Sequence, residues 1–173
     1  MDSLPPLADP MLDPSPARSF GFRLWQVKHA FTRRLGAALE PLDLTHIQYV
    51  LLRTTDHLAA QGEQPTQARL AEWLGADRMM VSKVLRLLES KGLVSRPVHP
   101  DDPRAHHVVL TGAGRQVLQQ AVPVALRTQQ AFFGSLGRER ATQFGAMLDD
   151  LLRLDGGVLS CPPIVTTTTK EPA

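Results

Sequence analysis

Apolar positions along the chain predict a mostly helical protein with one short β-hairpin. In six stretches, apolar residues recur every three or four positions, as they do on the buried side of an amphipathic helix. The predicted helices cover residues 18–39, 45–61, 67–74, 78–91, 112–136 and 138–154. Two strand candidates, residues 93–96 and 106–110, flank a turn rich in Pro and Asp at residues 97–103. The predicted order is therefore four helices, two strands and two helices.

Local sequence signals support several of the predicted helix ends. Residues 45–48 have the pattern of a capping box, and Asp77 and Thr111 are placed as N-caps. Gly92 stands where a residue in the left-handed conformation ends a helix, and Pro123 is a candidate for a kink in the long fifth helix.

Residues 66–94 have the organisation of a helix-turn-helix, because two helices are joined by the tight turn Gly75-Ala76-Asp77. Successive helical residues are about 100° apart, so the second helix can be divided into two faces. The face predicted to pack inward consists of Val81, Val84, Leu85 and Leu88. The outward face carries three cations, a hydroxyl and a thioether, from Arg78, Met79, Ser82, Lys83 and Arg86.

This outward face suits a helix that lies in the major groove of DNA. Arg and Lys can donate hydrogen bonds to guanine, Ser can donate or accept, and Met can contact a thymine methyl group. The first helix of the pair would cross the DNA backbone, and Gln67 at its start joins the predicted DNA-binding residues. The helix pair by itself is equally compatible with a solvated surface helix in an unrelated bundle.

The hairpin that follows the second helix has the position of a wing. Its tip carries Arg104, which can enter a narrow minor groove, where the negative potential is strongest. Asp102 is placed to pair with Arg104 or with Arg96 and so to fix that geometry. An exposed pair of this kind contributes little stability, but its place in a wing adds Asp102 and Arg104 to the predicted DNA-binding site.

Charge is distributed unevenly, although the formal net charge is only +2. Residues 66–115 contain eight Lys and Arg against five acids, and residues 18–40 contain five against one. An excess of this size is a weak indication of nucleic-acid binding, and it matters because one of the two basic segments coincides with the helix-turn-helix.

Other observations exclude several classes of protein. Cys161 is the only cysteine, so there is neither a disulfide framework nor a thiolate metal cluster, which suits a cytoplasmic location. No apolar run is long enough to span a bilayer, and residues 1–17 lack the features of a secretory signal. No catalytic motif has a recognisable context, so we expect neither enzymatic activity nor a cofactor.

The region from Thr45 to Arg115 resembles the MarR (multiple antibiotic resistance regulator) family of bacterial transcription factors. The segments that carry the resemblance are ARLAEWLGAD, VSKVLRLLESKGLVSR and DDPRAHHVVLTGAGR. LLESKGLVSR followed by D-x-R and LT-x-x-G is a specific combination. Pro103 departs from the family pattern, which often has an Arg there, and this removes one cation from the wing.

The resemblance implies a winged helix-turn-helix joined to a helical dimerisation region, within a mostly α fold with a small β-hairpin wing. The implied division is a DNA-binding domain at residues 41–111, a dimerisation region at 18–40 and 112–154, and a flexible arm and tail at 1–17 and 155–173. It also implies a homodimer that binds a pseudo-palindromic DNA site as a repressor released by a small molecule. The many apolar residues of the outer helices independently favour a dimer.

Members of this family often respond to small aromatic or phenolic ligands in a cleft between the dimerisation region and the head. In this sequence the resemblance implies a cleft lined by the first, second and fifth predicted helices. The candidates for such contacts are Trp25, His29, His46 and Arg53, although a structural role also explains each of them.

Two alternatives remain open at this stage. One is a winged-helix interaction module whose basic face docks an acidic protein. The other is a metal-responsive regulator, in which His99, Asp101 and one of the adjacent His106 and His107 gather at the wing. Neighbouring strand residues point to opposite faces, so His106 and His107 are poorly placed to share a metal, and no metal ligand is predicted.

Overall fold

The computed structural model describes residues 19–99 and 102–154. Its helices are α1 (Phe20–Leu39), α2 (His46–Ala60), α3 (Gln67–Trp73), α4 (Arg78–Ser90), α5 (Gly112–Phe133) and α6 (Arg138–Leu154), with short 3₁₀ turns η1 (Glu40–Leu42) and η2 (Gly134–Leu136). Its strands are β1 (Val94–Ser95), β2 (Val98–His99), β3 (Asp102–His106) and β4 (Val109–Leu110). The predicted order, four helices, a β-hairpin and two helices, is confirmed, but the hairpin contains four short strands where two were predicted.

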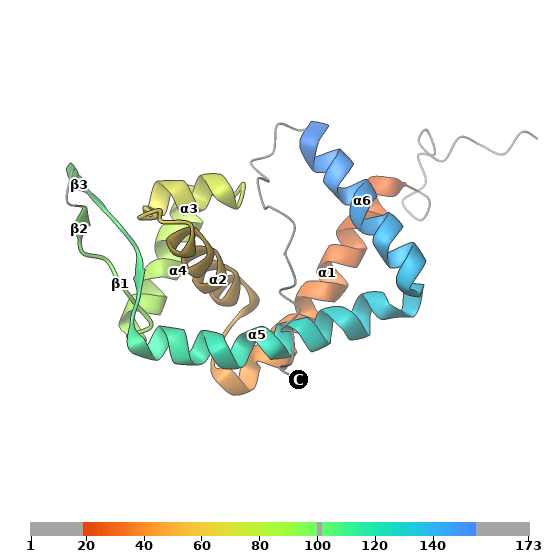
Figure 1. The fold of residues 1–173 in the computed structure, drawn as a ribbon, viewed down its shortest axis with the longest axis horizontal. Coiled ribbons are helices and arrows are strands. Elements are labelled where there is room, and N and C mark those ends of the chain that lie inside the picture. Colours follow the sequence, from red (N-terminus) through yellow and green to blue (C-terminus); the bar gives the residue numbers. More distant parts are fainter. Residues whose placement is uncertain (1–18, 100–101, 155–173) are drawn as a thin grey trace, which may run out of the picture.

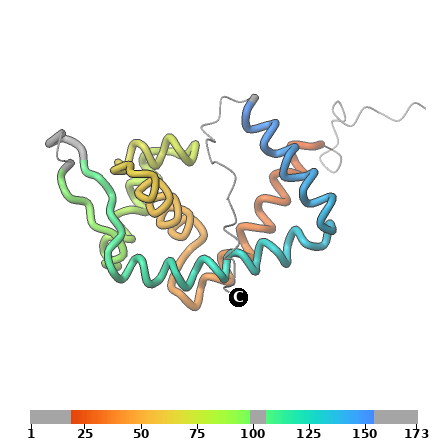
Figure 2. Tube along the Cα trace, viewed as in Figure 1, coloured from red at the N-terminus to blue at the C-terminus, as the bar shows by residue number. Residues whose placement is uncertain are grey.

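The molecule consists of a head and two outer helices that are connected by α5 (Figure 1). The head is made of α2, α3, α4 and the four strands. The long helix α5 begins beside the strands and extends to the outer helices α1 and α6 (Figure 2). The ring of Phe31 on α1 contacts those of Phe132 and Phe133 at the end of α5, and Phe133 in turn contacts Phe144 on α6. This aromatic cluster fixes the outer helices on the far end of α5.

The predicted caps are present and explain why the helices begin where they do. Thr45 and Gln48 form the capping box, with each side chain accepting from the other's main-chain N–H at 3.3 and 2.9 Å. The Asp77 carboxylate accepts from the N–H of Met80 at 2.8 Å, and Thr111 caps α5. Three-residue signals of this kind depend only on local sequence, so they could be recognised without the fold.

The core of the head confirms the predicted inward face of α4. The largest fully buried side chains are Leu39 at the end of α1 and, within the head, Leu51, Leu52, Leu58, Leu70, Leu85, Leu88, Val81, Val108 and Thr55. All four residues of the predicted inward face are buried. Burial of this apolar surface at roughly 25 cal/mol per Å² holds α4 in a fixed orientation, with its opposite side turned outward.

The hairpin differs from its prediction. The expected turn at residues 97–103 is shorter, because antiparallel pairing resumes beyond Pro97, where β2 pairs with β3. β1 pairs with β4 at the root, with Val94 opposite Leu110. Pro97 has no N–H to donate to the strand ladder, so the ladder is interrupted at this residue. Strand pairing continues beyond it, and the hairpin therefore extends past Pro97.

Two other helical predictions need comment. The fifth helix ends at Phe133, and the three residues predicted to continue it form the 3₁₀ turn η2. Pro123 lies inside α5, and the helix is continuous through it. The predicted flexible arm and tail, residues 1–17 and 155–173, lie outside the described residues, as does Cys161.

Candidate nucleic-acid interface

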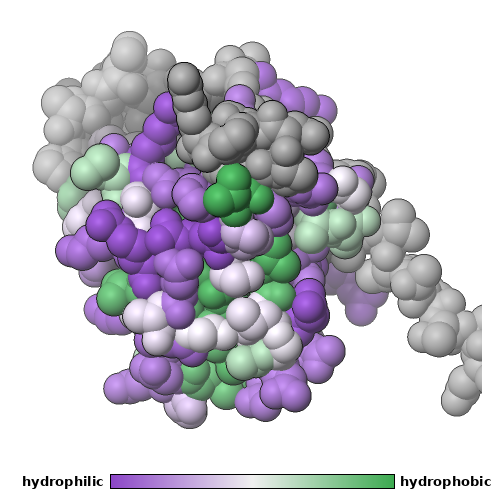
Figure 3. Space-filling model, turned by 90° about the vertical axis from the view of Figure 1, so that its left-hand side faces the viewer, coloured by the Kyte–Doolittle hydropathy of each residue, from purple (hydrophilic) through white to green (hydrophobic). Residues whose placement is uncertain are grey.

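The outward face of α4 is open to solvent. Arg78, Lys83 and Arg86 are exposed, Met79 has 73% of its surface accessible, and Ser82 is half-buried. None of the three cations forms an ion pair with any residue in 19–99 or 102–154. The end of the molecule that carries the strands presents a largely hydrophilic surface with apolar residues between (Figure 3). The charge on α4 is therefore available to an anionic partner.

Gln67 connects the two helices of the helix-turn-helix. It is half-buried at the start of α3, and its Nε2 donates to the main-chain oxygen of Arg78 across 3.4 Å. This contact joins α3 to the first turn of α4. It places Gln67 beside the predicted reading residues, and a direct contact of Gln67 with DNA stays a prediction.

The root of the hairpin is attached to the rest of the head by main-chain hydrogen bonds. The N–H of Val108 donates to the oxygen of Pro65 at 2.7 Å, and His107 forms an isolated bridge with Thr66. On the other side, the N–H and hydroxyl of Thr111 donate to the oxygens of Leu93 and Gly92 at 3.1 and 2.6 Å. The wing is thus fixed to α3 and to the start of α5.

A side-chain ion pair links the wing to α4. Arg96, between β1 and β2, directs Nε and Nη2 to the Oε2 atom of Glu89 at 2.9 and 2.6 Å. Glu89 is the only acid on α4 and lies seven residues after Ser82, on the same side of the helix. Its pairing with Arg96 offsets a negative charge that would otherwise stand beside the exposed cations.

The wing residues proposed for DNA binding are only partly described. Asp102 and Arg104 lie in β3, but their side chains are outside the described part of the structure. The predicted pairing of Asp102 with Arg104 or Arg96 therefore stays a prediction.

Three of the four ligand candidates do not line the cavity described below. On α1, the rings of Trp25 and His29 stack on one another at 5.5 Å between centroids, and Phe22 stacks on Trp25 at 5.7 Å. Arg53 is exposed on α2, where it pairs with Asp56 at 3.2 Å. These contacts give each side chain a partner within its own helix.

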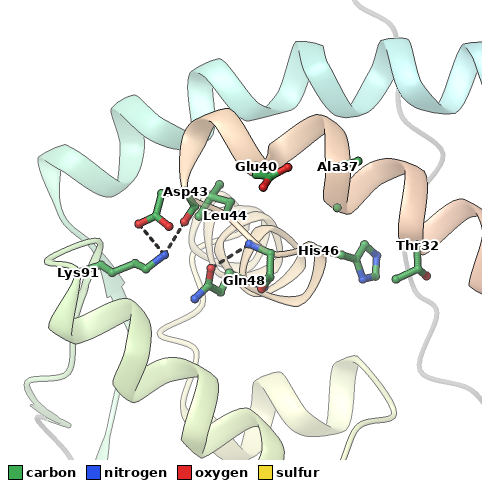
Figure 4. A pocket seen from close by; sticks show the side chains of 10 residues that line it. Thr32, Ala37, Glu40, Asp43, Leu44, His46, Gln48 and Lys91 are labelled. Carbon is green, nitrogen blue, oxygen red and sulfur yellow. Dashed lines mark hydrogen bonds and ion pairs between the residues drawn. The ribbon is translucent and has the colours of Figure 1, made fainter.

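His46 is the candidate that lines a cavity, of about 500 Å³, between α1, the start of α2 and the end of α4. Its side chain projects from α2 toward α1 (Figure 4). The cavity lining comprises Thr32, Gly36, Ala37, Glu40, Asp43, Leu44, Thr45, His46, Gln48 and Lys91. The predicted cleft included the fifth helix, which contributes no residue here. Burial, followed by the positive charge of Lys28, lowers the pKa of His46, which favours the neutral form of the ring.

Lys91 and Asp43 line the same cavity and were outside the predicted site. The Nζ of Lys91 lies 2.9 Å from the Asp43 carboxylate and also donates to the Asp43 main-chain oxygen. Asp43 has a left-handed conformation, with φ of 52°. The two residues are 48 positions apart, so neither periodicity nor a local motif could have joined them.

The described residues contain no group of three or more His, Cys, Asp and Glu side chains able to hold a metal ion. Asp101, needed for the alternative metal site, lies outside them, and the Nδ1 of His106 is 2.9 Å from the Arg96 main-chain oxygen. Across the described ranges, no helix combines the length and the apolar character that crossing a bilayer requires.

Comparison with known proteins decides the family. The MarR family profile matches residues 44–106. YdcH, an HTH-type transcriptional regulator of Bacillus subtilis, is 38% identical over 138 residues, which cover 80% of this chain and 92% of that protein. The chain belongs to the MarR family of transcriptional regulators. The resemblance carried by residues 45–115 is therefore confirmed.

Solved MarR-family structures have the same fold. A mutant of MarR from E. coli, complexed with operator DNA, matches with a TM-score of 0.70 and 26% identity over 76% of this chain and 92% of that one. The Mycobacterium tuberculosis MarR-family protein Rv2887, in complex with DNA, matches with a TM-score of 0.60 and 28% identity over 76% of this chain and 96% of that one. The predicted fold, helical with a small winged hairpin, is confirmed for this MarR-family chain.

Proposed function

We propose that this chain is a homodimeric, sequence-specific DNA-binding repressor, which inserts α4 of each copy into a major groove of a pseudo-palindromic site. The observation that carries the proposal is the outward face of α4, where Arg78, Lys83 and Arg86 surround Met79 without ion-pair partners among the described residues. Both solved relatives described above are complexes with DNA. Rv2887, 29% identical over 131 residues, is named as a transcriptional repressor.

Exposed apolar residues on the outer helices and on α5 support the homodimer. These residues are Phe20, Phe22, Leu24, Trp25 and Val27 on α1, Leu126 on α5, and Met147, Leu151 and Leu152 on α6. Within one chain these side chains are exposed to solvent. Apolar surface gathered in this way favours association with a second copy, because covering it removes it from water.

We also propose that binding of a small molecule releases the protein from DNA. The cavity between α1, α2 and α4 has the volume of a small-molecule site, about 300–1,000 Å³. Its lining combines apolar carbons with polar groups on His46, Gln48 and Lys91. An aromatic or phenolic ligand in this cavity would contact the junction between α1 and the head. A shift of the head relative to α1 would then change the distance between the two heads of a dimer.

Duplex binding measured by fluorescence anisotropy tests the proposal. The duplex carries the DNA sequence that lies upstream of the gene for this chain. Its binding constant should fall steeply as salt is added, and the logarithm of the binding constant should change with the logarithm of the salt concentration by a slope of about −0.9 per phosphate contact. Arg86→Ala should cost about 1–3 kcal/mol at the best site and relax its sequence preference. Arg140→Ala, which removes an exposed arginine from α6, is the matched control and should leave affinity unchanged. Absence of binding to every duplex in dilute buffer would overturn the proposal.

A further inference from the structure

The outgoing arm of the wing is attached to α4 through one partly buried charged contact. Only 23% of the Arg96 side chain and 39% of the Glu89 side chain are accessible, and both guanidinium contacts converge on one carboxylate oxygen. Charge-assisted hydrogen bonds of 2.6–2.9 Å are among the stronger polar contacts in proteins. Glu89 lies in the last turn of α4, so the contact joins the helix to the wing over a short path.

Arg96 also lies at the break between the two paired sections of the hairpin. Residues 96 and 97 are outside the strands, and the β2–β3 register shifts between Val98 and His99. The returning arm is attached through Val108 and Thr66, and the Nδ1 of His106 contacts the Arg96 main-chain oxygen. Arg96 is therefore bound on one side to α4 and on the other to β3, at a break in the strand pairing that the His107 N–H spans with one hydrogen bond to the Pro97 oxygen at 3.2 Å.

We infer that the Glu89–Arg96 pair sets the angle between the wing and α4. When α4 contacts the bases of the major groove, this angle would place the wing at the correct position in the neighbouring minor groove. Glu89 and Arg96 are then positioning residues, and neither needs to touch a base. The inference rests on the proposed function. It assigns specificity at the flanks of the site to a contact made within the protein.

A simple electrostatic role for Glu89 predicts the opposite result. Removal of a carboxylate near DNA reduces repulsion of phosphates, which raises affinity for every duplex alike. Loss of a positioning contact instead reduces discrimination between preferred and scrambled flanks while the preference at the bases under α4 persists. The two roles can therefore be separated by one substitution, Glu89→Gln, which keeps the size and removes the charge.

The experiment compares wild type, Glu89→Gln and the control Glu72→Gln, an equal change of charge on α3. Binding is measured on duplexes with one core and either preferred or scrambled flanks, and amide exchange is measured on the free proteins. We expect Glu89→Gln to reduce the flank preference by roughly five- to tenfold, a size typical of coupled contacts. Amides of residues 94–96, 98, 99 and 106–110 should exchange faster, whereas those of α2 should not. Glu72→Gln should change neither quantity.

The outcomes separate this inference from the proposed function. If Glu89→Gln tightens binding to all duplexes equally, with unchanged flank preference and wing exchange, the inference is overturned. If wild type binds no duplex, the proposed function fails, and the exchange measurement still decides whether the pair restrains the wing.

Discussion

At the scale of single residues, Gly114 shows how close the first turn of α5 lies to the wing. A Cβ atom at Gly114 would lie 2.0 Å from the main-chain oxygen of Leu93, whereas one at Gly112 would meet nothing within 4 Å. Since the obstacle is backbone, we expect Gly114→Ala to destabilise the fold by about 1–3 kcal/mol or more. Gly112→Ala should be neutral or stabilise by up to about 1 kcal/mol, because Ala favours helix. Urea denaturation compares the two, and equal stability of the variants would contradict this packing.

A second residue-scale prediction concerns how the Glu63–Arg69 ion pair affects stability at low pH. The hydrogen bond from Arg69, at 3.0 and 3.3 Å, holds the pKa of Glu63 below its ordinary value of 4.5. A carboxylate with a lowered folded pKa stabilises the protein above its unfolded pKa, and that contribution is lost as pH falls through the folded pKa. The difference in unfolding free energy between wild type and Glu63→Gln should therefore narrow below pH 4.5. A constant difference across that range would show that the ion pair does not contribute.

The single residues that the sequence could predict are those whose environment is local. The caps at Thr45, Asp77 and Thr111 follow from neighbours within three positions. The need for glycine at position 114 appears in the sequence only as part of the LT-x-x-G pattern, since the obstacle at Leu93 belongs to another element.

At the scale of elements, the Lys91–Asp43 contact joins the end of α4 to the junction of α1 and α2. The Asp43 side chain is 89% exposed, so solvent screens the pair. We expect Lys91→Met to cost less than about 1 kcal/mol in unfolding free energy, as measured by urea denaturation. A much larger loss would mean that the contact is a principal support of the head.

Helices were more predictable than the wing, for a physical reason. A helix is specified by its own periodicity and caps, so α2, α4 and α6 begin and end within about two residues of the prediction. The paired section beyond Pro97 depends on cross-strand contacts and on the attachment of Arg96 to Glu89, which periodicity does not encode. The faces of α4 were predictable because one side is apolar throughout.

At the scale of the whole molecule, the apolar surface of the outer helices predicts an obligatory partner. Leu24 on α1 and Leu151 on α6 are 51% and 59% exposed. Leu151→Glu should weaken the dimer and reduce DNA affinity, because a charge would be buried between copies. Leu87→Glu, an equal change at an exposed position on α4, should leave the dimer intact. Sedimentation analysis distinguishes the variants, and an unchanged dimer in Leu151→Glu would place the interface elsewhere.

Selection of bound sites from a random duplex pool tests the central claim most directly. A dimer that reads DNA through α4 predicts a two-fold symmetric motif, with half-sites about one helical turn, 10–10.5 base pairs, apart. The same selection with Arg78→Ala or Arg86→Ala should give a motif degraded at defined positions in both halves. A pool that remains random, or a motif without symmetry that survives both substitutions, would contradict the account.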